Sequence, residues 1–350
     1  DEYVRIDHES DVENSSQRLV LDACKKKITL CSAWFGEFLL FYHVDGLNLV
    51  ISSSFKDILE FLRSKKVLIE PDRVAIFESL IMDCPIRDRT FCKQIKKTTP
   101  GRKIVFELAP FDVKSSSTYI RRYYHGGEDS DDKLLLNRAT EILASLFSTS
   151  DLRGIDDRRV LLPLSGGNDS RLLACLLKKH GVSFDCITFG PRESLDPIMA
   201  KWVAARLGVE VRHLLLEDSF YKLFGDEVTV KSDGFSGHAH CHLYSVLKNS
   251  QIYNDFIIHS YAAEMSSATI TDWPDDSNIS KDQAMSRFMS ERVTNKPLWG
   301  IASTEIKKNV VQDLDKVMEE CCTINHPQYF NDYLNKVDIT SIKISNIFNV

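Results

Sequence analysis

Residues 161–181 read LLPLSGGNDSRLLACLLKKHG, and this stretch decides the fold of the second half of the chain. A short apolar run, typical of a buried strand, leads into a glycine loop at 165–170, and leucines at helical spacing follow it. A loop between a strand and a helix presents backbone N–H groups and a helix N-terminus to a ligand. The stretch therefore predicts an anion-binding loop.

The loop residues predict that this anion is a phosphate. Gly166 and Gly167 allow the backbone to approach a ligand closely. Ser165 and Ser170 add hydroxyl donors, and Asp169 can hold a divalent cation that bridges phosphates. The spacing matches neither G-x-x-x-x-G-K-[ST] nor G-x-G-x-x-G, so the two commonest phosphate loops are excluded.

The segments around the loop predict an α/β architecture with a parallel sheet and helices on both faces. Short apolar runs alternate with amphipathic helical patterns, as in βαβ units. Strands are expected at 158–164, 183–190, 209–216 and 255–260, and helices at 170–180, 196–208 and 219–228. Beyond residue 275 the pattern is mainly helical.

The first third of the chain reads differently, as a mixture of strands and helices of the α+β type. Asp45-Gly46 between two β-rich runs predicts a hairpin. Helical patterns cover 55–66 and 70–83. A polar, acidic stretch follows, and it predicts a linker at 126–133 between a domain at 1–125 and a second domain at 134–350 that ends in helices.

Composition excludes several classes of protein. The 350 residues contain no apolar run of the roughly 18 residues that a membrane span needs, so no membrane partner is expected. The N-terminus shows no secretory signal, and a cytoplasmic location is expected. The net charge is −6 without a long basic run, which argues against nucleic acid. Nine cysteines without a C-x-x-C pair predict reduced thiols rather than a zinc or iron–sulfur site.

The Ser-Gly-Gly-x-Asp-Ser loop resembles the pyrophosphate loop of the ATP pyrophosphatases. The order of RVLLPLSGGNDSRLLACLL, FDCITFG, DPIMAKWVAARLGVEVRHLLL and DFIIHSYAAEM resembles the synthetase domain of asparagine synthetase and its relatives, including β-lactam synthetases and lasso-peptide cyclases. The resemblance implies an adenine nucleotide alpha-hydrolase-like fold that uses ATP and Mg²⁺. It also implies a ligase that activates a carboxylate as an acyl-adenylate with release of pyrophosphate, before an amine or ammonia attacks to form an amide.

The resemblance further implies a set of partners and site residues. The partners would be a small-molecule or peptide carboxylate, an ammonia or amine donor, and a second copy of the chain or a partner protein. Asp169 and Glu264 would hold magnesium. Asp169, Tyr261 and Lys336 are the catalytic candidates, with Tyr261 at the position of the family's proton acceptor and Lys336 as the phosphate-neutralising lysine. The expected ATP-binding residues are Leu164, Ser165, Gly166, Gly167, Asn168, Asp169, Ser170, Thr188, Phe189, Gly190 and Ser260.

The first region resembles the later part of a glutaminase-type (Ntn-type) domain. The resemblance rests on GEFLLFYHVDGLNLVISSSFKDILEFL, EPDRVAIFESLI and IKKTTPGRKIVFEL. In that family an N-terminal cysteine is the nucleophile, whereas this chain begins with Asp1. Glutamine hydrolysis is therefore not expected, and the first region is interpreted as a partial domain.

Two other functions stay open. A tRNA-modifying ATP pyrophosphatase would carry a basic face and paired cysteines, which the composition disfavours. A degenerate synthetase could serve as a nucleotide-binding or partner module.

Three further features also have two interpretations. The stretch from His238 to His242 is either a metal-binding site or a helix start that faces the substrate. The first interpretation rests on the H-x-H-x-H spacing, which on a strand points three imidazoles to one side. Arg192 and Glu193 either contact phosphate or substrate, or lie on a solvated loop. Cys321-Cys322 is interpreted as packing, not as a site.

Overall fold

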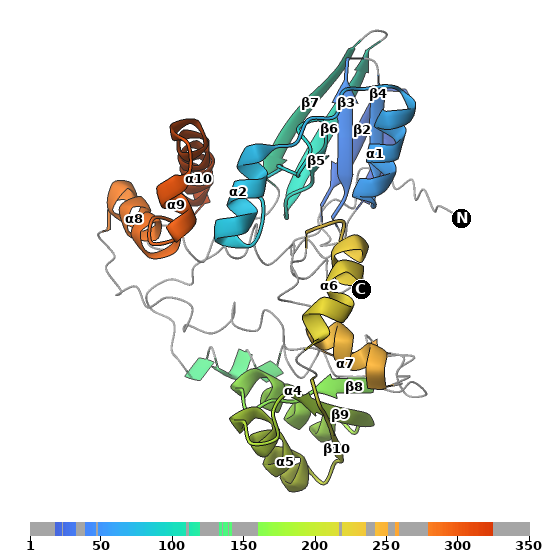
Figure 1. The fold of residues 1–350 in the computed structure, drawn as a ribbon. Coiled ribbons are helices and arrows are strands. Elements are labelled where there is room, and N and C mark those ends of the chain that lie inside the picture. Colours follow the sequence, from blue (N-terminus) through green and yellow to red (C-terminus); the bar gives the residue numbers. More distant parts are fainter. Residues whose placement is uncertain are drawn as a thin grey trace. The chain divides into compact units, whose positions relative to one another are not determined.

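The structure is a computed structural model in which the chain divides into two compact units, each described here by itself (Figure 1). The first unit comprises Asp1–Tyr124, Val230–Ser236 and Ala268–Val350, and the second comprises His125–Thr229 and Gly237–Ser267. The described residues are 18–22, 24–32, 39–46, 48–109, 112–119, 133–134, 136–138, 140–141, 160–216, 219–235, 242–250, 256–258 and 279–324.

The first unit contains two antiparallel sheets. One has the order β1-β2-β6-β7 and the other β4-β3-β5. Their strands are β1 (Arg18–Asp22), β2 (Lys27–Cys31), β3 (Phe41–Asp45), β4 (Asn48–Ser52), β5 (Lys96–Lys97), β6 (Arg102–Ala109) and β7 (Asp112–Tyr119). The hairpin predicted at Asp45-Gly46 is confirmed, because β3 pairs with β4 and the Asp45 carboxylate accepts the Asn48 N–H at 2.9 Å.

The two sheets pack face to face, and a helix covers the outer side of the second sheet. Leu30 and Phe106 of the first sheet pack against Tyr42 of the second. On the opposite face of the second sheet, Phe41 packs against α1 (Phe55–Ser64). The helix begins after Ser54, whose side chain accepts the Asp57 N–H, and its buried residues recur at helical spacing. The layers follow from this alternation of apolar faces.

The C-terminal helices pack against α2 (Arg73–Met82) in the first unit. They are α8 (Lys281–Phe288), α9 (Pro297–Ile301) and α10 (Thr304–Ile324), with a π-helical turn at Met289–Val293 between α8 and α9. Phe77 and Ile81 of α2 share one core with Phe288, Val310 and Leu314. This arrangement differs from the division expected from the sequence, which assigned these helices to the second domain. An apolar helix face shows that a partner exists, but not which surface provides it.

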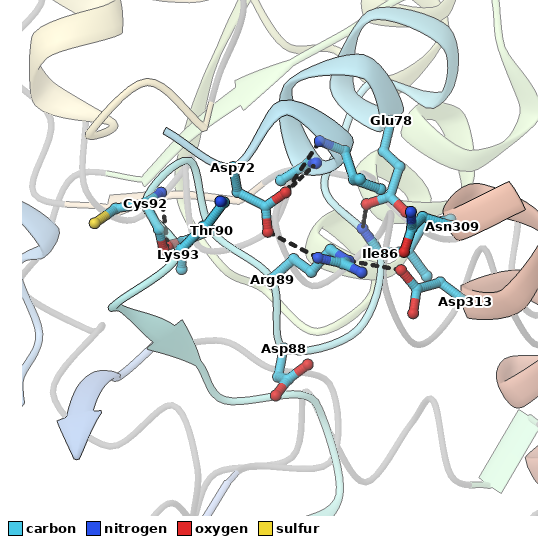
Figure 2. A network of polar contacts seen from close by, with 12 residues as sticks. Asp72, Glu78, Ile86, Asp88, Arg89, Thr90, Cys92, Lys93, Asn309 and Asp313 are labelled. Atoms are coloured by element: carbon cyan, nitrogen blue, oxygen red, sulfur yellow. Dashed lines mark hydrogen bonds and ion pairs between the residues drawn. The ribbon is translucent and has the colours of Figure 1, made fainter. Parts of the chain in front are cut away.

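A buried ion-pair network joins α10 to the loop after α2 (Figure 2). Arg89 donates to Asp313 of α10 at 2.6 Å and to Asp72 at 2.8 Å. The two carboxylates raise the pKa of the Arg89 guanidinium, although burial alone would lower it. Asp72 also accepts the Val74 and Ala75 N–H groups at the start of α2. The same carboxylate therefore caps one helix and, through Arg89, anchors another.

The second unit contains the parallel sheet predicted from the sequence. Its strands are β8 (Val160–Pro163), β9 (Phe184–Phe189), β10 (Val211–Leu214) and β11 (Phe256–Ile257), in the order β10-β9-β8-β11. Every pairing within it is parallel. Its helices are α4 (Asn168–Lys179), α5 (Leu195–Leu207), α6 (Phe220–Lys231) and α7 (His242–Ser250), with the end of α6 belonging to the first unit.

Helices cover both faces of this sheet, as predicted. Leu162 and Cys186 point to the face that carries α4 and α5, and burial raises the pKa of the Cys186 thiol to about 12. Leu161 and Ile187, one position away on the same strands, point to the face that carries α7. Figure 1 shows α4 and α5 beside one another along β8 and β9. Successive strand residues alternate between faces, so both faces need cover.

Among the helices in the described ranges, none combines the length and the apolar character that a bilayer crossing requires.

Candidate functional site

The glycine loop lies where the strand order of the parallel sheet reverses. The loop follows β8, whose neighbours are β9 on one side and β11 on the other. The chain passes from β8 to β9 and β10 in one direction and later returns to β11 on the opposite side. In open parallel sheets, ligands bind beyond the carboxyl ends of the strands at such a reversal. Topology therefore selects the same loop that the sequence predicted.

Hydrogen bonds within the loop hold two hydroxyl groups side by side. Gly167 N–H donates to Ser165 Oγ at 3.1 Å, and Ser165 N–H donates to Ser170 Oγ at 3.2 Å. The hydroxyl oxygens of Ser165 and Ser170 are 3.1 Å apart. Ser170 is buried, so packing fixes its hydroxyl in place. The loop thus presents a preformed pair of hydroxyl donors.

Helix α4 begins without a side-chain cap. Its N-cap is Gly167, which has no side chain to accept the N–H groups of the first turn. Asp169 lies in this first turn and is partly buried. An uncapped helix N-terminus binds anions through its backbone amides and the positive end of the helix dipole. The start of α4 is therefore suited to a phosphate group.

Asp196 is a loop contact that sequence reasoning missed. Its Oδ1 accepts the Gly166 N–H at 2.9 Å. A Cβ at Gly166 would lie 3.2 Å from that oxygen and 3.2 Å from Met199 Cβ, so a larger residue would be crowded here. Sequence reasoning marked Arg192 and Glu193 in the same β9–α5 connection, and the structure leaves both exposed. The available signal was the position of Asp196 in the first turn of the next helix of a βα unit.

Arg171 is a second contact that sequence reasoning missed. Its Nε donates to the Gly167 carbonyl at 3.2 Å, and a terminal nitrogen donates to Asn168 Oδ1. Both acceptors are neutral, so the positive charge of the guanidinium stays next to the loop. The sequence signal for these contacts was the spacing of Arg171 from Asn168 and Gly167, because residues three and four apart on a helix share one face.

The end of β9 lies beside the loop, as expected for the neighbouring strand. Thr188 is buried, and Phe189 and Gly190 are partly buried. Gly190 has φ +111°, a conformation that favours glycine, and its carbonyl accepts a hydrogen bond from His213 Nε2 at 2.9 Å. Leu164 is also buried, with its side chain in the core beneath α4 and α5. Contact between these residues and ATP stays a prediction.

Several predicted residues lie outside the described part of the chain. They are Ser260, Tyr261, Glu264 and Lys336, together with His238 and His240. His242 begins α7, so the last of the three histidines lies at a helix start. Cys321 and Cys322 lie near the end of α10. The roles predicted for these residues from the sequence stay predictions.

The described residues suit a magnesium ion that is carried by phosphates rather than by a protein cage. Within the described ranges, no three His, Cys, Asp or Glu side chains gather as a metal site. Mg²⁺ usually keeps several waters and binds one or two carboxylates together with substrate phosphates. Asp169, at the helix start that is suited to phosphate, can supply such a carboxylate.

The parallel sheet, the loop and the helix that follows it fit an α/β unit of the adenine nucleotide alpha-hydrolase-like type. Residues 143–250 match the family model described as asparagine synthase. For that part of the chain, this match confirms the asparagine synthetase-like resemblance predicted from the sequence. Members of that family use ATP, usually with Mg²⁺, and the match supports an ATP-using enzyme of the ligase type.

Other comparisons add little. No curated protein matches the chain. NMN synthetase from Francisella tularensis is 17% identical with a TM-score of 0.29, over 61% of this chain and 92% of that one. A predicted subunit of tRNA methyltransferase from Methanocaldococcus jannaschii is 17% identical with a TM-score of 0.23, over 49% of this chain and 90% of that one. At such TM-scores neither likeness bears on fold or function.

Proposed function

We propose that the protein is an amide-forming synthetase. It would activate a carboxylate with Mg-ATP, release pyrophosphate, and let an amine or ammonia attack the resulting acyl-adenylate. The observation that carries this proposal is the uncapped start of α4 beside the paired hydroxyls of Ser165 and Ser170, at the reversal of the strand order. The asparagine synthase match over residues 143–250 supports the choice of chemistry.

The loop would act by positioning and by electrostatics. The N–H groups of the first α4 turn and the two serine hydroxyls would bind the β- and γ-phosphates, which leave together as pyrophosphate. Donors that are fixed before the reaction stabilise the charge that develops on the leaving group. Asp169 would hold Mg²⁺, which neutralises phosphate charge when it is bound. Glu264 as a second magnesium ligand, Tyr261 as proton acceptor and Lys336 as phosphate contact remain part of this proposal.

The first unit keeps its proposed likeness to a glutaminase-type domain. The two antiparallel sheets packed face to face, with α1 on one side, support it. Free ammonia or an amine on the substrate is proposed as the nitrogen source.

Calorimetric titration of Mg-ATP tests the nucleotide site. The wild-type chain should show saturable binding, and Asp169→Ala should lose it. Asp282→Ala is the matched control, because Asp282 also lies in the first turn of a helix but belongs to the first unit. That variant should bind Mg-ATP normally. Wild-type protein without affinity for Mg-ATP, or equal binding by Asp169→Ala, would contradict the proposal.

A turnover assay tests the reaction itself. Candidate carboxylates are incubated with Mg-ATP and an amine, and AMP and pyrophosphate are quantified. Both products should appear in equal amounts and should vanish in Asp169→Ala. Glu264→Ala should abolish the same magnesium-dependent turnover. Release of ADP and phosphate instead of AMP and pyrophosphate would overturn the proposed chemistry.

A further inference from the structure

An open groove of about 870 Å³ lies between α4 and α5. Of the described residues that line it, three are cationic, namely Arg171, Lys201 and Arg206, and none carries a carboxylate. Apolar surface between them comes from Leu172, Met199 and Trp202. The volume is near the upper end of the roughly 300–1,000 Å³ usual for ligand pockets, so the groove suits a ligand larger than a single amino acid.

The apolar part of the groove is unusually accessible. Trp202 is 68% exposed and Leu172 is 49% exposed. A tryptophan normally buries most of its ring, and exposed tryptophans are enriched where partners bind. The two side chains face solvent from adjacent helices whose inner faces are packed on the sheet. The outer faces of α4 and α5 therefore offer an apolar anchor point.

The cations of the groove lack acidic partners. In the described part of the chain, neither Lys201 nor Arg206 forms an ion pair, and the hydrogen-bond acceptors of Arg171 are neutral oxygens. The two acidic residues of α4 and α5 are Asp169 and Asp196, and both lie in first turns at the loop. In a chain of net charge −6, such a surface attracts anionic groups by charge complementarity.

We propose that this groove binds an acidic peptide segment of the substrate, with an apolar side chain of that peptide against Trp202. The inference rests on the proposed function. Continuity with the loop carries the choice of a substrate peptide, because Asn168 and Arg171 belong to both the loop contacts and the groove lining. A peptide that lies along the two helices would extend to the start of α4, where its reactive carboxylate meets the nucleotide.

Other anionic occupants fit the groove less well. Binding to an anionic bilayer typically uses a cluster of about four to eight cations, whereas three described cations line this groove. Nucleic acid needs a longer basic face than three cations provide, since its affinity grows with the number of phosphates neutralised. A second copy of this chain remains as an outcome that the experiment must separate.

Fluorescence anisotropy with two labelled peptide pools tests the groove. One pool alternates aspartate or glutamate with leucine or phenylalanine over ten residues, and the other carries asparagine or glutamine at the acidic positions. The wild-type chain should bind the acidic pool at least about tenfold more tightly, as expected for complementary charges. The Lys201→Glu/Arg206→Glu double variant should lose this preference. Trp202→Ala should weaken binding of the acidic pool without any change in net charge.

The matched control is Lys178→Glu/Lys179→Glu. It makes the same change in net charge at exposed positions of α4 that do not line the groove. This control should bind the acidic pool like the wild-type chain, and all three variants should bind Mg-ATP normally in calorimetry. Equal weakening in both charge-reversal variants, or equal binding of both pools, would overturn the proposal. Conversion of a dimer to a monomer by Trp202→Ala in sedimentation would overturn it as well.

A turnover arm distinguishes a substrate from a regulatory partner. With Mg-ATP and an amine present, the acidic pool should stimulate AMP release over the neutral pool, and Lys201→Glu/Arg206→Glu should remove the stimulation. Binding in the groove without AMP release would overturn the assignment to substrate. Failure of the nucleotide site itself is recognised separately, because wild-type protein would then show no Mg-ATP binding in calorimetry.

Discussion

Two helix starts, that of α2 in the first unit and that of α4 in the second, differ in how their polar groups are paired. In the first unit, the buried carboxylates of Asp72 and Asp313 share the guanidinium of Arg89, and Asp72 also caps α2. In the second unit, α4 begins at Gly167 without a side-chain cap, and Arg171 binds only neutral oxygens. Buried polar groups in stable cores are normally satisfied, whereas functional sites depart from that rule. This contrast between the start of α4 and the Arg89 network supports the proposal of a functional site at the start of α4.

Arg89→Leu removes the cation of the buried ion-pair network in the first unit. It should have the largest effect, a loss of unfolding free energy. It leaves two carboxylates with side-chain exposures of 9% and 7% without their shared cation. Removal of one partner from a buried ion pair costs about 3–5 kcal/mol of unfolding free energy. Chemical denaturation should show a loss of this order, while Mg-ATP binding to the folded variant stays normal. A loss below about 1 kcal/mol would contradict the role given to this network.

Gly166→Ala tests the glycine loop at the start of α4 in the second unit. The added methyl would lie 3.2 Å from Asp196 Oδ1 and from Met199 Cβ, so these neighbours or the loop must give by a few tenths of an ångström. We expect Mg-ATP affinity to fall by about 10- to 100-fold, or roughly 1.4–2.8 kcal/mol. Gly167→Ala is the comparison, because its methyl would meet only the Ser165 hydroxyl, at 3.2 Å. Calorimetry should rank the wild-type chain first, Gly167→Ala second and Gly166→Ala last, and the reverse order of the two variants would contradict the crowding argument.

Asp196→Ala tests the hydrogen bond between Asp196 and the loop, and its effect on Mg-ATP affinity should be smaller. Loss of the acceptor for the Gly166 N–H frees the loop to take other conformations, so ordering it on binding costs more. Mg-ATP affinity should fall by about fivefold, close to 1 kcal/mol. Asp196→Asn keeps an oxygen acceptor and should retain most of the affinity. Tighter binding by Asp196→Ala would mean that this carboxylate competes with phosphate for the amide.

Lys93→Met removes an exposed ion pair, whose contribution to stability should be much smaller than that of the buried Arg89 network. Lys93 pairs with Glu70 at 2.8 Å, but both side chains are about half exposed, at 54% and 47%. Exposed pairs contribute about 0–1 kcal/mol, because water screens the charges. Denaturation of this variant should give a change within that range. A loss as large as that of Arg89→Leu would show that burial is not what separates the two pairs.

Thiol alkylation at pH 8 compares the core of the second unit with its surface. Cys186 is buried in β9, and burial raises the pKa of its thiol to about 12, so almost none of the reactive thiolate forms at this pH. Cys175 is exposed in the α4–α5 groove. Mass spectrometry should find Cys175 modified in the folded chain and Cys186 modified only after unfolding. Early modification of Cys186 would contradict the closed packing of α4 and α5 on the sheet.

Local sequence patterns were sufficient to predict individual helices, strands and turns. They were not sufficient to predict which of these elements contact one another. The hairpin at Asp45-Gly46, the glycine loop and α4 were predictable, because turn residues and apolar spacing act over a few neighbouring residues. Asp196 was not found, since its contact with Gly166 joins residues thirty positions apart. The Arg89 network was equally hidden, because one of its acceptors is the N-cap of α2 and the other lies on α10.

The sequence by itself determined the parallel α/β unit, the glycine loop between its first strand and helix, and the family resemblance. Each depends on a contiguous pattern whose residues are neighbours in the chain. Only the tertiary structure decided that the C-terminal helices pack on α2 and that the strand order reverses at the loop. It also decided that Asp196 reaches Gly166 and that three cations line one groove. These features depend on which apolar faces meet, and burial is non-directional, so a pattern of apolar residues does not name its partner.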